Sequence, residues 1–229
     1  MLKDPPLLTI RRTFKRPHRE LLGKLKGAQT GHIVDALEGR GALDHHVKPV
    51  DAECAMFVGP ALTCETGAND NLAIMACLVL AEPGDVIIAA CDSHSATAVV
   101  GDNLTMMAKN KGVTAIVIDG MARDRDGIVP VGIPVFARGI TPNSCVRSGP
   151  GRIGFPIVCG GVAVQPGDIL LGDRDGVAVI PQDQAAAVAA KLEEIQRMEE
   201  ATQARIRAGM THLDSVADLL KSDRTVYVD

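Results

Sequence analysis

The 229-residue sequence predicts an α/β fold, and three observations lead to that class. In the first half of the chain, apolar β-branched runs alternate with stretches of helical character. Between Val129 and Ile180, short apolar runs are instead separated by Gly and Pro at close intervals, as in a β-rich layer. After Pro181, a stretch rich in Ala, Glu, Gln and Arg indicates one long helix. Alternating strands and helices favour a parallel sheet with right-handed crossovers, so we expect that sheet, a β-rich layer and a C-terminal helix.

Two helices are expected near the start of the chain. The pattern over residues 19–26 is helical, and Thr30 is placed to cap a second helix that ends at the glycines at 39 and 41. We interpret this pair as a helical lid. For the basic segment 11–19, a solvated arm or a strap in subunit contacts is favoured over a tag for anionic surfaces.

A strand, a helix and further strands should follow. The apolar segment 52–64 predicts a strand, and Asp70 is placed to cap a helix that runs to about Ala81. The Glu-Pro-Gly-Asp turn at 82–85 leads into the apolar run VIIAAC. A helix over 103–111 then leads through Gly112 into the strand VTAIVI.

Two features of the later chain have competing interpretations. The QPGD turn at 165–168 resembles the turn at 82–85, which indicates either an internal repeat or, as we favour, the reuse of one turn chemistry. In the predicted helix 182–208, steps of three and four residues place Glu199 on or beside an otherwise apolar stripe. Met198 can carry the stripe instead, which would leave Glu199 in solvent.

The length of the chain favours one domain. A chain of this size buries roughly 70 to 75% of its extended surface, enough for a large core without disulfides. We divide it into an N-terminal arm and helix over 1–29, a core over 30–181, a C-terminal helix over 182–208 and a tail over 209–229.

Composition argues against several classes of partner. The net charge is −4, with 24 basic and 28 acidic residues, and the chain has no Trp, one Tyr and four Phe. It therefore lacks the basic face and the aromatic platforms of nucleic-acid-binding proteins. No run approaches ~20 apolar residues, and the N-terminus has charges and prolines where a secretory signal would be apolar, so we expect no membrane partner. The six cysteines form no CxxC pair, which fits a reducing cytoplasm.

The segment VTAIVIDGMARD, residues 113–124, is the strongest functional signal. An apolar run ends in Asp-Gly and is followed by Arg123 and Asp124. Ligands gather where the strands of open α/β sheets end, and loops after neighbouring parallel strands converge there. The residues 101–104, whose free amides at a helix start suit a carboxylate, should therefore face the same ligand. The structural alternatives make Asp102 a simple helix cap and Asp124 an exposed ion-pair partner of Arg123.

Other candidate sites are weaker. Mg²⁺ is commonly held by one carboxylate with waters and substrate oxygens, so Asp124 needs no further ligand cluster. The six histidines show no metal spacing, which argues against a zinc site. The sequence GPGRIG at 149–154 matches GxGxxG, but Pro156 and strand-like residues follow instead of a helix, so we expect no dinucleotide or methyl-donor site. Lys109 and Lys111 lie at the end of a polar helix, which disfavours imine catalysis.

Four motifs together resemble the RraA-like family. They are GDNL at 101–104, DGMARD at 119–124, PVFARG at 134–139 and VQPGDILLGDRDGVAVIP at 164–181, and the likeness covers about 30–200. That family includes 4-hydroxy-4-methyl-2-oxoglutarate and 4-carboxy-4-hydroxy-2-oxoadipate aldolases and the protein regulator of ribonuclease E. The resemblance implies a swivelling β/β/α three-layer fold, a homotrimer or a dimer of trimers, and an active site between subunits.

The resemblance also implies roles for particular residues. Asp124 would bind Mg²⁺ or Mn²⁺ directly or through water, and Arg123 would contact the substrate oxyanion. The amides of Gly101, Asp102, Asn103 and Leu104 would hold the pyruvyl carboxylate, and Asp102 would order metal-bound waters. Asn71 aligns with a position near the pocket, and Glu199 resembles a carboxylate supplied by an adjacent subunit.

These roles imply a class II aldolase that cleaves a 4-hydroxy-2-oxo dicarboxylic or tricarboxylic acid to pyruvate and a second oxo acid. Decarboxylation of oxaloacetate forms the same enolate, so the same site should catalyse it. The alternatives are a dedicated oxaloacetate decarboxylase and a non-catalytic regulator that binds ribonuclease E.

Overall fold

A parallel sheet forms the centre of the structure, a computed structural model that describes residues 4 and 6–229. Its strands lie in the order β3 (Phe57–Glu65), β4 (Val86–Ala90), β6 (Ala115–Ile118) and β8 (Val135–Ala137). Helix α3 (Leu72–Leu80) links β3 to β4, and α4 (Asp102–Lys111) precedes β6. The predicted alternation of strands and helices is confirmed.

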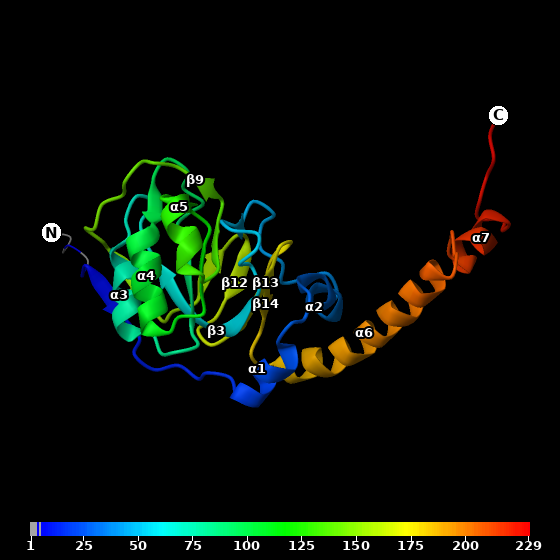
Figure 1. Ribbon diagram of the computed structural model, residues 1–229, viewed down its shortest axis with the longest axis horizontal. Helices are drawn as coiled ribbons and strands as arrows, with labels where there is room; N and C mark the ends of the chain where they lie inside the picture. The colour runs from blue at the N-terminus through cyan, green and yellow to red at the C-terminus, as the bar shows by residue number, and fades with distance from the viewer. Residues whose placement is uncertain (1–3, 5) are drawn as a thin grey trace.

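Successive residues of these strands enter two different cores, because side chains alternate between the faces of a sheet. Ile87 and Ala89 of β4 pack in a core with α3 and α4, whereas Val86 and Ile88 pack against later strands. Those later strands are β11 (Ile157–Cys159), β12 (Val162–Val164), β13 (Ile169–Asp173) and β14 (Gly176–Ile180). Helices α3 and α4 cover one side of the body (Figure 1). The chain thus has the three-layer β/β/α order.

The two N-terminal helices pack far from α3 and α4. Helices α1 (Arg19–Leu25) and α2 (Thr30–Ala36) share a core with β13, β14 and the start of α6 (Ala185–Arg207). They lie beside α6 at the opposite end of the body from α3 (Figure 1). The predicted lid is therefore wrong, because the apolar faces of these helices cover the β layer.

Thr30 anchors α2 without capping it. Gln29 is the N-cap residue, and the N–H and hydroxyl of Thr30 donate to the buried carboxylate of Asp173 at 2.7 and 2.9 Å. The expected cap is wrong because this carboxylate, distant in sequence, satisfies the helix start.

A small parallel sheet lies beside the central one. It pairs β5 (Ala98–Val100) with β7 (Met121–Ala122) and β7 with β9 (Gly139–Ile140). Strand β5 leads into α4, and β7 leads into α5 (Arg125–Ile128), which the short helix η1 (Val129–Val131) follows. The buried strand predicted before Arg123 ends at Ile118, and β7 intervenes.

The N-terminal arm packs against the body of the same chain. Strand β1 (Leu8–Ile10) pairs with β10 (Gly151–Ile153), which is antiparallel to β3, while β2 (Lys48–Pro49) pairs with β8. Arg16 Nε and Nη2 donate to the two carboxylate oxygens of Asp85, each at 2.8 Å. Arg16 therefore ties the basic segment 11–19 to the body, while most of the other residues of that segment are exposed.

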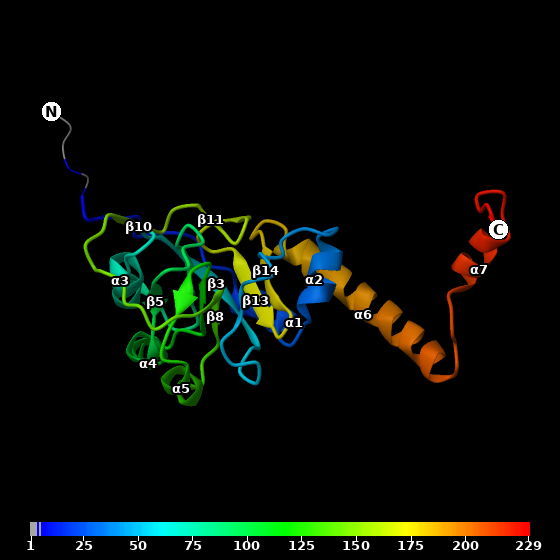
Figure 2. The same cartoon turned by 90° about the horizontal axis from the view of Figure 1, so that it is seen from above.

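The predicted C-terminal helix is confirmed, and much of it projects from the body (Figures 1 and 2). Its last buried residue is Leu192, and α7 (Asp214–Leu220), which was not predicted, follows. Glu199 is exposed, and its carboxylate accepts a hydrogen bond from Gln203 Nε2 at 2.9 Å. No described helix has both the length and the apolar composition needed to span a membrane.

Candidate active site

Two neighbouring parallel strands of the small sheet position the candidate site. Gly101 directly follows β5, and Arg123 and Asp124 directly follow β7. The N–H of Arg123 donates to the carbonyl oxygen of Val100 at 2.9 Å, which fixes the two strand ends side by side. The sequence therefore predicted the convergence of these two loops.

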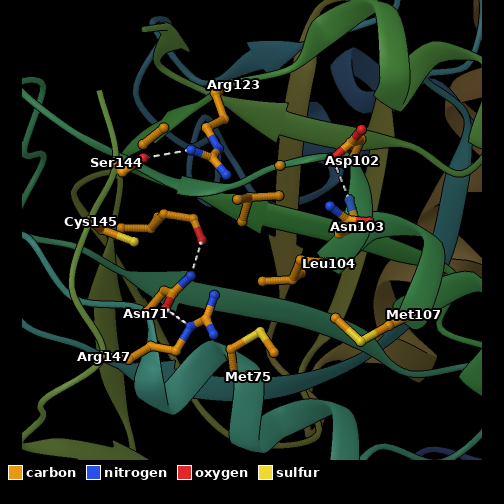
Figure 3. Close-up of a pocket in the computed structure, with 14 residues that line it drawn as sticks. Asn71, Met75, Asp102, Asn103, Leu104, Met107, Arg123, Ser144, Cys145 and Arg147 are labelled. Atoms are coloured by element: carbon orange, nitrogen blue, oxygen red, sulfur yellow. Dashed lines mark hydrogen bonds between the residues drawn. The ribbon is translucent and has the colours of Figure 1, made fainter. Parts of the chain in front are cut away.

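A cavity of about 310 Å³ opens where these strands end (Figure 3). Six residues expected at a substrate site line it, namely Asn71, Gly101, Asp102, Asn103, Leu104 and Arg123. Asp124 is outside the cavity lining but pairs with Arg123 at its edge. Glu199 belongs to α6, which projects from the body (Figure 1), and is not among the residues that line this cavity.

The amino end of α4 presents backbone donors to the cavity. Thr105 N–H donates to Gly101 O at 3.0 Å, so the amides before Thr105 have no acceptor within the helix. In this structure the carboxylate of Asp102 accepts one of them, Asn103 N–H, at 2.6 Å. Gly101, not Asp102, is the N-cap residue. The simple cap interpretation of Asp102 is wrong, and the remaining amides suit an anionic group.

Arg123 is held between two partners. Its Nε lies 3.0 Å from Asp124 Oδ2, and its Nη1 donates to Ser144 Oγ at 2.6 Å. Both members of the ion pair are about two-fifths exposed, so the pair adds little stability in water. Its geometric effect is larger, because it fixes the guanidinium at the cavity wall.

The backbone at Asp124 is left-handed, with φ 56° and ψ 45°. This conformation is uncommon outside glycine, although Asp tolerates it better than most residues. It turns the chain from β7 into α5. At this turn the Asp124 carboxylate lies beside the guanidinium of Arg123.

Two glycines allow the acidic groups to lie close to backbone. A Cβ on Gly101 would lie 2.7 Å from Asp124 Oδ2 and 3.3 Å from Arg123. A Cβ on Gly127 would lie 2.6 Å from Asp102 Oδ2. Glycine at both positions therefore lets two carboxylates and one guanidinium approach the same corner.

The donor set at this corner fits a hydrated divalent cation. Asp124 and Asp102 offer carboxylate oxygens at the solvent-open end of α4 and α5. Hard cations such as Mg²⁺ take oxygen ligands and keep several waters, so one or two carboxylates suffice. Among the described residues, the only compact group of three ligand-type side chains lies elsewhere, at Asp44, His45 and His46.

In that histidine group, His45 and His46 both approach Asp44 Oδ1, with Nδ1 at 3.4 and 2.8 Å. Arg138 Nη1 donates to the other oxygen of Asp44 at 3.0 Å. The GPGRIG sequence contains strand β10, which pairs with β1 on one side and β3 on the other, and no helix follows it, in agreement with the expectation that it is no dinucleotide loop.

Sequence reasoning missed part of the cavity wall. Ser144, Cys145 and Arg147 come from one segment that runs beside β5, and Met75 and Met107 come from α3 and α4. Burial raises the pKa of the Cys145 thiol. No motif or period marks the 144–147 segment, and only its pairing in the fold brings it to the site.

Comparison with known proteins places the chain in a family. A family model described as RraA-like, Aldolase/RraA, matches residues 30–179. The chain belongs to the RraA-like family.

Several RraA-like relatives span most of the chain. A protein of Halalkalibacterium halodurans named "Putative 4-hydroxy-4-methyl-2-oxoglutarate aldolase" is 37% identical over 187 residues, 82% of this chain and 89% of that protein. A Thermus thermophilus protein named 4-hydroxy-4-methyl-2-oxoglutarate aldolase is 31% identical, over 56% of this chain and 77% of that one. The crystal structure of Streptomyces coelicolor RraAS2, described as an unusual member of the RNase ES inhibitor RraA family, superposes with a TM-score of 0.74. It is 26% identical and covers 83% of this chain and 100% of that chain.

Proposed function

We propose that this protein is a divalent-metal-dependent aldolase that cleaves a 4-hydroxy-2-oxo dicarboxylic or tricarboxylic acid to pyruvate and a second oxo acid. One observation carries the proposal: the Arg123 guanidinium and the free amides of α4 line the same cavity. A 2-oxo acid presents two hydrogen-bond acceptors, a carboxylate and the carbonyl beside it. The guanidinium and the amides are the donors that these two acceptors need. The names of the two aldolase relatives support the same activity.

The chain's own residues account for the charge that develops during cleavage. The amides of the 101–104 segment that remain free hold the pyruvyl carboxylate, which orients the 2-oxo group toward Arg123. As the C3–C4 bond breaks, its electrons form an enolate, and negative charge gathers on the C2 oxygen. The fixed guanidinium of Arg123 stabilises that charge. Protonation at C3 then gives pyruvate.

A base must remove the proton of the C4 hydroxyl. Asp102 lies on the same wall of the cavity, and we assign it the ordering of a water that accepts this proton. A divalent cation bound by Asp124 would supply Lewis-acid polarisation of the 2-oxo group. Because oxaloacetate yields the same enolate on losing carbon dioxide, we expect decarboxylation as a side activity.

The proposal includes assembly into a homotrimer or a dimer of trimers. Glu199 is exposed on a helix that leaves the body, so within one chain it has no route to the cavity. We assign it to the site of a neighbouring subunit, where its carboxylate would assist Asp102.

A second function has one observation in its favour. The superposed RraAS2 structure is described as a member of an RNase ES inhibitor family, so a regulator that binds a ribonuclease of that type is the alternative. Such a regulator needs no divalent cation and no reactive cavity.

Pyruvate release tests the proposal. The purified protein is supplied with 4-hydroxy-4-methyl-2-oxoglutarate or with oxaloacetate, with and without a chelator, and Asp124→Ala is compared with wild type. We expect Mg²⁺-dependent release that the chelator and the substitution both abolish. Absence of release by the wild type, together with tight binding to ribonuclease E, would favour the regulator.

A further inference from the structure

We propose that Arg147 binds the distal carboxylate of the substrate, so that the site selects oxo acids with a negative charge at both ends. This inference rests on the proposed function for the identity of the reacting end. It concerns a residue that neither the motifs nor the family resemblance indicates.

The cavity has a guanidinium on each of two facing walls. Figure 3 shows Arg123 on one wall and Arg147 on the other, and both line the cavity. Arg123 is paired with Asp124. In the described part of the chain, no carboxylate forms an ion pair with Arg147. The charge of Arg147 is therefore available to a ligand.

A neutral side chain orients Arg147. Asn71 is 7% exposed, and its Nδ2 donates to Val99 O at 3.2 Å. Its Oδ1 accepts a hydrogen bond from Arg147 Nε at 3.0 Å. These bonds hold one edge of the guanidinium and direct its terminal nitrogens toward the cavity (Figure 3). Those nitrogens form the fork that binds a carboxylate in bidentate fashion.

The backbone around Arg147 is also fixed. Asn71 N–H donates to Val146 O at 3.1 Å, and Val146 N–H donates to Asn69 O at 2.9 Å. Beyond Arg147, the amides of Ser148 and Gly149 both donate to the carboxylate of Asp70, a residue that is 4% exposed. A loop held on both sides places the guanidinium before any ligand arrives, which lowers the entropy cost of binding.

The space between the two arginines suits a carbon skeleton. Leu104, Met75 and Met107 line the same cavity (Figure 3). A substrate with its pyruvyl end at Arg123 and the α4 amides would extend along these side chains. Its far carboxylate would then meet Arg147.

Substrate selectivity tests this proposal. Pyruvate release is measured from 4-hydroxy-4-methyl-2-oxoglutarate and from a 4-hydroxy-2-oxo monocarboxylic acid, for wild type, Arg147→Gln and Arg147→Lys. We expect Arg147→Gln to raise KM for the dicarboxylate roughly tenfold or more, the range of a lost charged hydrogen bond, with kcat nearly unchanged. Turnover of the monocarboxylate should stay within about twofold. Arg147→Lys keeps the charge but not the fork, so its selectivity should be intermediate.

Arg152→Gln is the matched control. Arg152 is an exposed arginine that pairs with Glu65 outside this cavity, and its removal should leave the selectivity unchanged. If Arg147→Gln raises KM for both substrates equally, or for neither, the proposal is overturned.

Calorimetry separates this proposal from the aldolase assignment. Binding of 2-oxoglutarate, which has two carboxylates, is compared with binding of 2-oxobutyrate, which has one. If neither aldol substrate is cleaved but Arg147→Gln selectively loses 2-oxoglutarate, the aldolase assignment fails and the role of Arg147 stands. Equal binding of both ligands by the wild type would overturn that role.

Discussion

Gly101 is the residue on which the geometry of the site depends most closely. Its φ of −139° is open to any residue, so the demand for glycine comes from space alone. A side chain there would meet the Asp124 carboxylate and the Arg123 side chain. The groups that lie close to Gly101 are thus the protein's own side chains.

We therefore expect Gly101→Ala to lower kcat/KM for pyruvate release roughly ten- to hundredfold, because displacing Arg123 misplaces the charge at the reacting oxygen. Gly23→Ala, in α1 where no atom lies within 4 Å of the added Cβ, is the control. Full activity in Gly101→Ala would contradict the tight corner described here.

Cys145 provides a pH-dependent readout of the cavity. Its thiol pKa is raised, chiefly because burial disfavours the thiolate. The thiolate is the reactive form, so iodoacetamide labelling should increase with pH at a midpoint above about 8.5, the ordinary thiol value. Oxalate with Mg²⁺ should slow labelling of Cys145, because both would occupy the cavity that it lines.

Cys54 is the internal control for this labelling. Burial also raises the pKa of its thiol, but Cys54 does not line the cavity. Peptide mass spectrometry distinguishes the two residues. Equal protection of both thiols by oxalate would argue against a ligand in this cavity.

Residues with a local signal were the ones that could be predicted. Arg123 and Asp124 were predicted from the apolar run before them and 101–104 from the helix after them, and the structure brings them together through β5 and β7, two short strands that were not predicted. Arg147 could not be found this way, because its partner Asn71 is 76 residues away and no periodicity links them.

At the scale of the elements, the two Pro-Gly-Asp turns have the same internal hydrogen bond but lead into strands that pair differently. In one, Glu82 N–H donates to Asp85 Oδ2 at 2.9 Å, and in the other Gln165 N–H donates to Asp168 Oδ2 at 2.8 Å. The first turn leads into parallel β4 and the second into antiparallel β13. The shared turn chemistry is therefore confirmed, whereas the strands that follow have unlike pairings.

Asp70 joins the start of α3 to the loop that carries Arg147. Asn71, not the predicted Asp70, is the N-cap residue of α3, but Asp70 Oδ1 accepts Leu72 N–H at 2.7 Å and its Oδ2 accepts two amides of the loop. We expect Asp70→Ala to reduce the free energy of unfolding by about 2 to 4 kcal/mol, because buried donors lose their acceptor. Urea denaturation measures this loss.

Asp51→Ala is the comparison for Asp70. Asp51 accepts a single amide, that of Glu53, at an exposed turn, so its loss should cost under about 1 kcal/mol. Similar losses for the two variants would show that the loop does not depend on Asp70.

The predicted lid failed for a reason that local patterns do not contain. The helical patterns predicted α1 and α2 themselves, but not the surface that their apolar faces cover. Core contacts with β13, β14 and α6 decide that placement.

For the whole molecule, the projecting half of α6 is the main unexplained feature of a single chain. Mixed assemblies test whether it completes a neighbour's site. Asp124→Ala and Glu199→Ala should each be inactive alone, and refolding them together should restore about one quarter of wild-type activity, the share of sites that receives both carboxylates. No recovery in confirmed mixed oligomers would place Glu199 outside the site.

The central claim, that the corner formed by Gly101, Arg123 and Asp124 binds a divalent cation and an oxo acid together, is tested most directly by Mn²⁺ binding. Electron paramagnetic resonance measures free Mn²⁺ during titration of wild type, Asp124→Ala and the nearby exposed control Asp126→Ala, with and without oxalate. We expect oxalate to tighten Mn²⁺ binding in wild type and Asp126→Ala, and we expect Asp124→Ala to lose this binding. Unchanged, oxalate-dependent binding in Asp124→Ala would contradict the central claim.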